Sequence, residues 1–224
     1  MIEIMLDLVT DPNGNRRQKF IQVATTIRHS KHNKVGTGSI LAWGLSLQKI
    51  HIMDKLNSIP VSFAVVGGVA TRYYMPERQT QDLDILIAID DYSNICQYLQ
   101  SQGGTQLNQL APDLPQTIGS TWQLPDGQLL DVLASQLDWV KNAIARSIVY
   151  DRDPQELPII GLEYLVLMKL FSARTQDLAD ISRMMGYADE DIIKSTSALV
   201  KIELPSALED LENLIQLGKL ELGL

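Results

Sequence analysis

The chain has 224 residues, 45% of them hydrophobic, and a mean hydropathy of −0.01. This length can bury a full core, and the composition is typical of a globular protein rather than a disordered one. The net charge of −8 argues against general binding to a nucleic-acid backbone. The sequence has neither an apolar run of about 20 residues nor a basic-then-apolar start, so we expect a cytoplasmic protein without membrane contact.

The N-terminal section is basic, whereas the rest of the chain is acidic. Residues 1–56 contain eight Lys and Arg against four Asp and Glu. Segment 1–50 is rich in turn sequences and weakly periodic, and we assign it no function. Two alternatives stand for this segment: a flexible extension, or a start codon placed upstream of the true one at Met53. His29 and His32 fit a solvated basic loop better than a metal site, because no third ligand accompanies them.

An apolar run with a sharp end opens the main part of the chain. Phe63 to Val66 is bounded by Gly67-Gly68, which predicts a buried strand followed by a turn. A short helix is expected over 69–74. It should end near Pro76, because proline lacks an amide donor and disfavours helical geometry in the residue before it.

Two carboxylates lie at alternate positions of the next predicted strand, Asp82 and Asp84. The period of two places them on one face, about 7 Å apart at Cα. Carboxylates in this relation can converge on divalent ions, and Mg²⁺ is held by one or two carboxylates together with substrate phosphates. Gly67-Gly68 would supply a phosphate-binding turn to accompany these carboxylates, since a backbone without Cβ lets phosphate oxygens approach the amides of a helix N-terminus.

A helix is predicted over 92–102, with a glycine stop at Gly103-Gly104. Asp90 and Asp91 follow the strand and are expected to cap this helix rather than to bind metal. The single cysteine, Cys96, excludes an internal disulfide and is expected to be a buried thiol.

A second acidic strand is predicted in a hairpin. Residues 122–124 and 129–133 flank Pro125-Asp126-Gly127-Gln128, a sequence typical of a tight turn. Asp131 lies within the apolar run LLDVL, where burial of a carboxylate costs several kcal/mol unless it is paired or metal-bound. Taken singly, Asp131 fits a structural pair with an arginine as well as a functional site.

The C-terminal part is predicted to be helical. The buried helix over 162–172 contains Lys169, which must reach solvent or meet an anion. The next helix is expected to begin with Thr175 as N-cap and to stop at Gly186. On it, Asp177 and Asp180 share one face, where i, i+3 surface pairs with arginines would also explain them. Two amphipathic helices follow, the second opening with a capping box formed by Ser206 and Glu209.

The order of strand, Gly67-Gly68, short helix and Arg78-x-Thr80-x-Asp82-x-Asp84 resembles the signature of the DNA-polymerase-β-like nucleotidyltransferase superfamily. It is most similar to small prokaryotic members of the abortive-infection toxin type. The resemblance implies an α/β (α+β) fold with a nucleotidyltransferase core over residues 51–150. This core would have a mixed sheet backed by helices, with a C-terminal helical subdomain over residues 151–224.

The resemblance also implies a reaction. It is Mg²⁺-dependent transfer of a nucleoside monophosphate from an NTP to an acceptor hydroxyl on RNA (tRNA included), a protein or a small molecule. The setting would be toxin–antitoxin or phage defence, with an antitoxin or toxin as protein partner. Asp82, Asp84 and Asp131 would be catalytic and would bind two Mg²⁺ ions, with Asp131 helping to take the acceptor proton.

Further roles follow from the same resemblance. The nucleotide-binding residues would be Gly67, Gly68, Arg72, Arg78, Thr80 and Lys169. Asp177 and Asp180 would orient basic residues near the cleft. Gly68 stands where many relatives have serine, so a hydroxyl contact to phosphate is missing. Two other classes remain open: a catalytically silent nucleotide-binding or antitoxin-like partner protein, and an RNA-binding module that uses the basic N-terminal segment.

Overall fold

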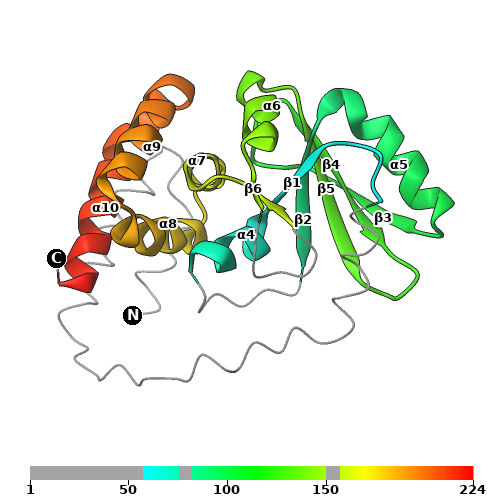
Figure 1. Cartoon of the computed structure of the whole chain (residues 1–224), viewed down its shortest axis with the longest axis horizontal. Coiled ribbons are helices and arrows are strands. Elements are labelled where there is room, and N and C mark those ends of the chain that lie inside the picture. Colours follow the sequence, from blue (N-terminus) through cyan, green and yellow to red (C-terminus); the bar gives the residue numbers. More distant parts are fainter. Residues whose placement is uncertain (1–57, 76–81, 150–156, 224) are drawn as a thin grey trace, which may run out of the picture. The chain divides into compact units, whose positions relative to one another are not determined.

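The computed structural model describes residues 58–75, 82–149 and 157–223 (Figure 1). Segment 1–50, Arg78 and Thr80 lie outside these residues. The chain divides into two compact units, the first with described residues between 58 and 172 and the second from Ala173 onward. The predicted α/β class, with a mixed sheet backed by helices, is confirmed.

The first unit is built on a seven-stranded sheet with the strand order β3-β4-β5-β2-β1-β7-β6. Strands β2 and β5 run parallel, as do β1 and β7, and the other neighbours are antiparallel. The strands are β1 (Phe63–Val66), β2 (Leu83–Ala88), β3 (Thr105–Leu110), β4 (Thr117–Gln123), β5 (Leu129–Ser135), β6 (Ile148–Val149) and β7 (Pro158–Ile159).

The two central strands are buried on both faces. Ala64, Val65 and Val66 in β1 have no exposed surface, and neither do the three consecutive residues from Ile85 to Ile87 in β2. Strands covered on both sides are apolar nearly throughout, which explains the sequences FAVV and LDILIA. Asp84 is therefore an acidic side chain in a strand that is otherwise apolar.

Helices flank this sheet (Figure 1). The first unit contains α4 (Gly67–Tyr74), α5 (Tyr92–Ser101), α6 (Asp138–Ala145), α7 (Leu162–Ser172) and the short 3₁₀ turn η1 (Ile89–Asp91). None of the helices in the described ranges is long and apolar enough to cross a bilayer.

Helices α5 and α6 cover one face of the sheet. On α5, the side chains of Tyr92 and Cys96 hydrogen-bond to Ser120 of β4, and burial raises the pKa of both groups. On α6, Ile144 lines the same cavity as Phe63 of β1. The strand register places Phe63 and Ser120 on the same face, so the opposite face, to which Asp84 belongs, is not the one under α5 and α6.

The predicted cap of α5 is correct in position but wrong in its interaction. Asp91 is the N-cap residue, yet its side chain makes no capping hydrogen bond. Asp90 instead accepts a hydrogen bond from Lys141 Nζ on α6, at 3.1 Å. An aspartate at an N-cap commonly accepts from the amides of the first turn, and Asp91 does not do so here.

A half-buried tyrosine connects α4 to the residue that follows β7. Tyr74 donates a hydrogen bond from its hydroxyl to the carbonyl oxygen of Ile160, at 2.8 Å. Burial is the main cause that raises the pKa of Tyr74, and the neighbouring Tyr73 and Glu163 add to it. Helix α7 follows, with Lys169 only 8% exposed among apolar neighbours.

The second unit consists of α8 (Thr175–Tyr187), α9 (Glu190–Glu203), the 3₁₀ turn η2 (Pro205–Ala207) and α10 (Leu208–Leu222). Helices α8 and α10 pack with their backbones in close approach. A Cβ on Gly218 would collide with the carbonyl oxygen of Ser182 and would lie 2.9 Å from the Cα of Gly186. Gly186, predicted as a stop signal, therefore serves this contact, and α8 runs on to Tyr187.

Two predicted caps in this unit are wrong. The N-cap of α8 is Arg174, not Thr175, and its side chain makes no capping hydrogen bond. Helix α10 has Ala207 at its N-cap, because η2 occupies the residues before it, so Ser206 cannot form the expected capping box. Asp189 does cap α9, by accepting from the backbone N–H of Ile192 at 2.8 Å.

Replacement of Tyr74 by phenylalanine should lower the free energy of unfolding at neutral pH by about 1 kcal/mol, because the hydrogen bond to Ile160 is lost. The folded state favours the neutral phenol, so wild-type stability should fall as the pH rises above about 10, where an unfolded tyrosine ionises. Denaturant titrations between neutral pH and pH 11 should give a shallower decline for Tyr74→Phe. Tyr187→Phe, at a side chain 62% exposed, should keep the wild-type slope. Equal slopes for Tyr74→Phe and wild type would contradict this role.

Candidate functional site

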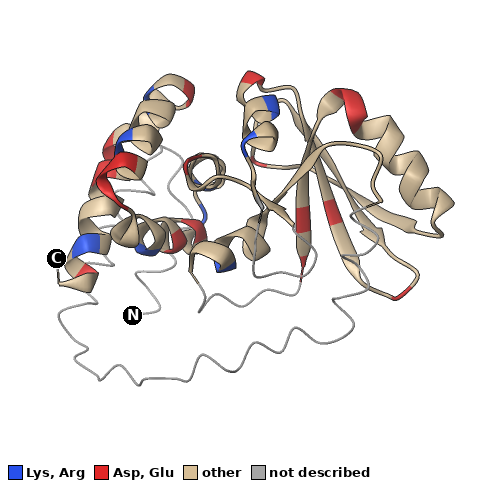
Figure 2. Ribbon diagram, in the orientation of Figure 1, with Lys and Arg blue, Asp and Glu red and all other residues tan. Residues whose placement is uncertain are grey.

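Two carboxylates face one another across neighbouring strands. The parallel pairing of β2 with β5 places Asp84 in register with Asp131. Paired residues of neighbouring strands point to the same face and lie about 4.8 Å apart. Acidic residues accordingly stand side by side on these two strands in Figure 2. The two acids predicted from separate segments thus share one location.

One oxygen of this pair is left without a partner. Asp131 Oδ1 is fully buried and accepts no hydrogen bond from any described residue. Buried polar atoms are hydrogen-bonded in the great majority of cases, and an exception needs an explanation. A bound cation or a substrate proton would satisfy this oxygen.

A glycine of the predicted phosphate turn lies directly against the acid pair. Gly67 begins α4 with a φ of +61°, and a Cβ added to it would collide with the carboxylate of Asp84 and approach its Cβ to 3.0 Å. Val66, the N-cap of α4, is in register with Asp84. The free backbone amides at the start of α4 are therefore close to Asp84, where a helix N-terminus favours anionic groups.

Asp82 takes a different position from the other two acids. It precedes the first residue of β2 and is exposed. Within residues 58–75, 82–149 and 157–223, no group of three or more His, Cys, Asp or Glu side chains is arranged to hold a metal ion. Asp84 and Asp131 still fit Mg²⁺, which needs only one or two carboxylates when substrate phosphates complete its shell. The orphaned Asp131 Oδ1 and the space that a Cβ at Gly67 would fill support this fit.

The other predicted nucleotide ligands are distributed over two helices. Gly68 is the second residue of α4, and Arg72 lies in its last turn, half-buried. Lys169 is buried in the last turn of α7, in the same compact unit.

Asp177 and Asp180 belong to the second unit and are buried, at 3% and 1% exposure. Asp177 Oδ2 accepts a hydrogen bond from Arg174 Nε at 2.7 Å, and Asp180 Oδ1 accepts one from Gln176 Nε2 at 2.8 Å. The i, i+3 pair of the alternative reading is present between Arg174 and Asp177, with an exposed guanidinium and a buried carboxylate. The prediction that these acids orient basic residues remains, with Arg174 as the residue that Asp177 holds.

Thr121 is a polar residue of this face that sequence reasoning missed. It is in register with Asp131 across the β4–β5 hairpin and is 8% exposed. Counting outward from the turn between Leu124 and Gln128 would have paired these two positions, since the turn fixes the register of a hairpin. Thr121 extends the polar row from Asp84 and Asp131 toward β4.

No family model matches the chain, and neither does any curated protein. Similar solved structures include the antibiotic-resistance factor ANT(2″)-Ia in complex with adenylyl-2″-tobramycin, at 15% identity. That match covers 75% of this chain and 95% of the other, with a TM-score of 0.43. The lincosamide antibiotic adenylyltransferase LnuA matches at 13% identity over 76% and 96% of the two chains, with a TM-score of 0.38. The Megavirus polyadenylate synthase matches at 11% identity over 88% of this chain and 45% of that one, with a TM-score of 0.43.

The contact between Gly67 and Asp84 can be tested with a matched pair of glycine substitutions. Gly67→Ala and Gly127→Ala both place an alanine at positive φ, which costs about 1–2 kcal/mol. Gly127 has no atom within 4 Å of an added Cβ, whereas at Gly67 the methyl group meets Asp84 and should add about 1–3 kcal/mol of overpacking. Denaturant unfolding of both variants measures the difference. Equal losses of stability would show that Asp84 does not press against Gly67.

Neutralisation of Asp131 should have opposite effects without and with metal. In EDTA, Asp131→Asn should raise the melting temperature by up to about 4 °C, because like charges opposite each other cost about 0.2–1 kcal/mol. Mg²⁺ or Mn²⁺ should stabilise the wild type and should stabilise the variant much less. Differential scanning fluorimetry measures both effects, with Asp113→Asn, in an exposed loop, as the control. An equal metal response in wild type and Asp131→Asn would argue against a cation at this pair.

Proposed function

We propose that the protein is a Mg²⁺-dependent nucleotidyltransferase that moves a nucleoside monophosphate from an NTP to an acceptor hydroxyl. The observation that supports this most is the placement of Asp84 in register with Asp131, whose buried Oδ1 has no partner among the described residues, directly beside Gly67. Such an arrangement joins a cation site to a helix N-terminus that can receive phosphate.

Asp84 and Asp131 would bind Mg²⁺. Asp82, two residues before Asp84, would become a further ligand when the nucleotide is present. Mg²⁺ bound there supplies neutralisation of the triphosphate charge and alignment of the reacting groups. We propose two Mg²⁺ ions, because carboxylates on adjacent strands can bind ions about 3.5–4 Å apart.

The backbone amides at the start of α4 would bind the phosphate oxygens. Gly67 and Gly68 leave room for this approach, since neither has a side chain. Arg72, Lys169 and Arg78 would attract the triphosphate by charge. Thr80 would be a further, uncharged nucleotide-binding residue; Arg78 and Thr80 lie outside the described residues.

Asp131 would act on the acceptor. Its Oδ1 would accept the proton of the acceptor hydroxyl as the acceptor oxygen forms a bond to the α-phosphorus. The bond from the α-phosphorus to the oxygen bridging the β-phosphate breaks, and pyrophosphate leaves. The Asp131 proton then passes to solvent, which restores the carboxylate for the next turnover.

The proposal specifies only that the acceptor carries a hydroxyl group. The acceptor would be RNA, including tRNA, a protein or a small molecule. A toxin–antitoxin or phage-defence setting, with an antitoxin or toxin as partner, belongs to the same proposal. The second candidate is a catalytically silent partner protein. The orphaned oxygen of Asp131 favours the enzyme, because a silent protein gains nothing from keeping an uncompensated buried acceptor beside a second carboxylate.

Transfer of label from each α-³²P-labelled NTP, with Mg²⁺ and cell extract, tests the reaction. Wild type should label an RNA, protein or small-molecule fraction, and Asp84→Asn should lower the rate by at least about 100-fold, as loss of a charge-stabilising group does. Asp113→Asn should retain wild-type transfer. Nuclease and protease digestion of the labelled product would identify the acceptor class. Absence of transfer with every nucleotide and with both Mg²⁺ and Mn²⁺ would favour the silent partner.

A further inference from the structure

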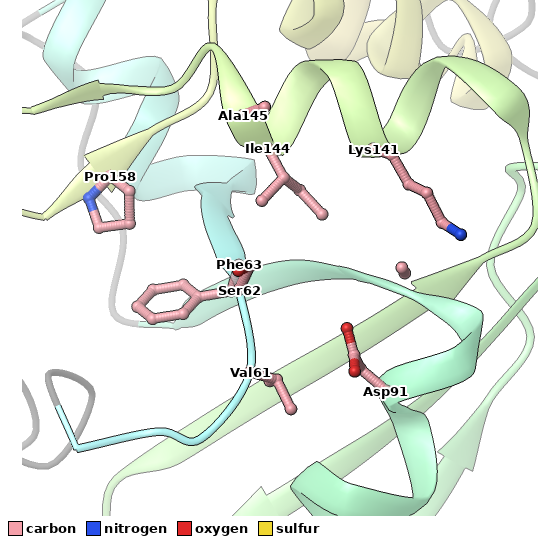
Figure 3. A pocket seen from close by; sticks show the side chains of 9 residues that line it. Val61, Ser62, Phe63, Asp91, Lys141, Ile144, Ala145 and Pro158 are labelled. Atoms are coloured by element: carbon pink, nitrogen blue, oxygen red, sulfur yellow. The ribbon is translucent and has the colours of Figure 1, made fainter.

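A cavity of about 520 Å³ lies at the other end of β1 and β2 from the acid pair (Figure 3). It lies against Phe63, the first residue of β1, and Ala88, the last residue of β2. Asp84 is four residues before Ala88, about 13 Å along an extended strand. Phe63 also lies on the opposite face of the sheet from Asp84, so the cavity and the acid pair are separate sites.

The walls of this cavity are mainly apolar and come from the first unit. They are formed by β1 and the segment before it, by the end of β2 with η1, by α6, and by β7; the apolar lining residues are Val61, Phe63, Ala88, Ile144, Ala145 and Pro158. Its volume lies within the range of about 300–1,000 Å³ that small-molecule sites occupy. In Figure 3 the ring of Phe63 and the side chain of Ile144 border the same space.

One wall of the cavity carries the carboxylate of Asp91, which makes no hydrogen bond that stabilises the neighbouring helix. Asp91 is the N-cap residue of α5 but makes no capping hydrogen bond. It has no hydrogen-bond or ion-pair partner within the described part of the chain, and its carboxylate points into the cavity in Figure 3. Lys141, the cationic lining residue, already pairs with Asp90 at 3.1 Å. Of the two charged lining residues, Lys141 therefore has an anionic partner outside the cavity lining, and Asp91 has no cationic partner in the described part of the chain.

We propose that this cavity binds a small organic cation, a primary amine carried on an apolar body. The ammonium group would donate hydrogen bonds to the carboxylate of Asp91, and charge-assisted bonds of this kind are among the strong ones. The apolar body would cover Phe63 and Ile144, and the aromatic face of Phe63 adds a favourable site for a cation. An organic anion of the same size would meet the carboxylate of Asp91, which repels it, and a Lys141 that already pairs with Asp90.

A matched pair of ligands tests the charge preference. The full chain is titrated with 2-phenylethylamine and, separately, with 3-phenylpropionate, which have similar hydrocarbon bodies and opposite charges. Isothermal titration calorimetry should give saturable millimolar binding of the amine and affinity at least about tenfold weaker for the carboxylate. Chemical-shift changes in labelled protein should fall on residues of β1 and α6 that line the cavity.

A matched pair of variants tests the role of Asp91. Asp91→Asn removes the charge at constant size, and asparagine is as good an N-cap as aspartate, so the fold is kept. It should lower the amine affinity at least about tenfold, whereas Asp113→Asn should leave it unchanged. Unchanged amine affinity in Asp91→Asn, equal affinity for the two ligands, or no amine binding would each overturn the proposal. Binding is measured without NTP or Mg²⁺, so its outcome is independent of the nucleotidyl transfer reaction.

Discussion

The parallel register that places Asp84 beside Asp131 is the constraint on which the candidate site in the first unit depends. Two like charges in one register row destabilise a sheet, and one oxygen of Asp131 is also buried without a partner. The unit tolerates both because the residues around Asp84 in β1 and β2 are fully buried apolar side chains. Natural proteins accept such local losses where function requires them. We therefore interpret the acid pair as a feature that lowers the stability of the fold and favours the binding of a cation.

Local signals in the sequence were sufficient for the elements that carry this pair. The apolar run before Gly67 predicts β1, and the turn at residues 125–128 predicts the hairpin, whose closing hydrogen bond runs from Leu124 N–H to the carbonyl oxygen of Gln128. Alternation in β2 predicts that Asp84 shares a face with Asp82. The parallel register of β2 with β5 was beyond such reasoning, because it joins residues 47 positions apart through contacts that no local pattern specifies. The meeting of Asp84 with Asp131 rested on the family resemblance alone.

The sequence was less informative where tertiary burial changes the role of a residue. A spacing of three predicts that Arg174 and Asp177 can pair, and they do, but it does not reveal that Asp177 and Asp180 are withdrawn from solvent. Caps failed for a related reason. A capping motif states a residue preference, whereas the geometry that realises it depends on the preceding backbone, which is a 3₁₀ turn at both η1 and η2.

The parallel register has a consequence for how this protein can diverge. Side chains alternate along a strand, so removal of a single residue from β5 upstream of Asp131 would rotate that carboxylate to the side covered by α5 and α6. Loss of two residues would return the carboxylate to its original face, but Asp131 would then lie opposite a residue of β2 other than Asp84. We therefore expect insertions and deletions in related chains to fall in the connecting segments, while the spacing within β2 and β5 stays constant.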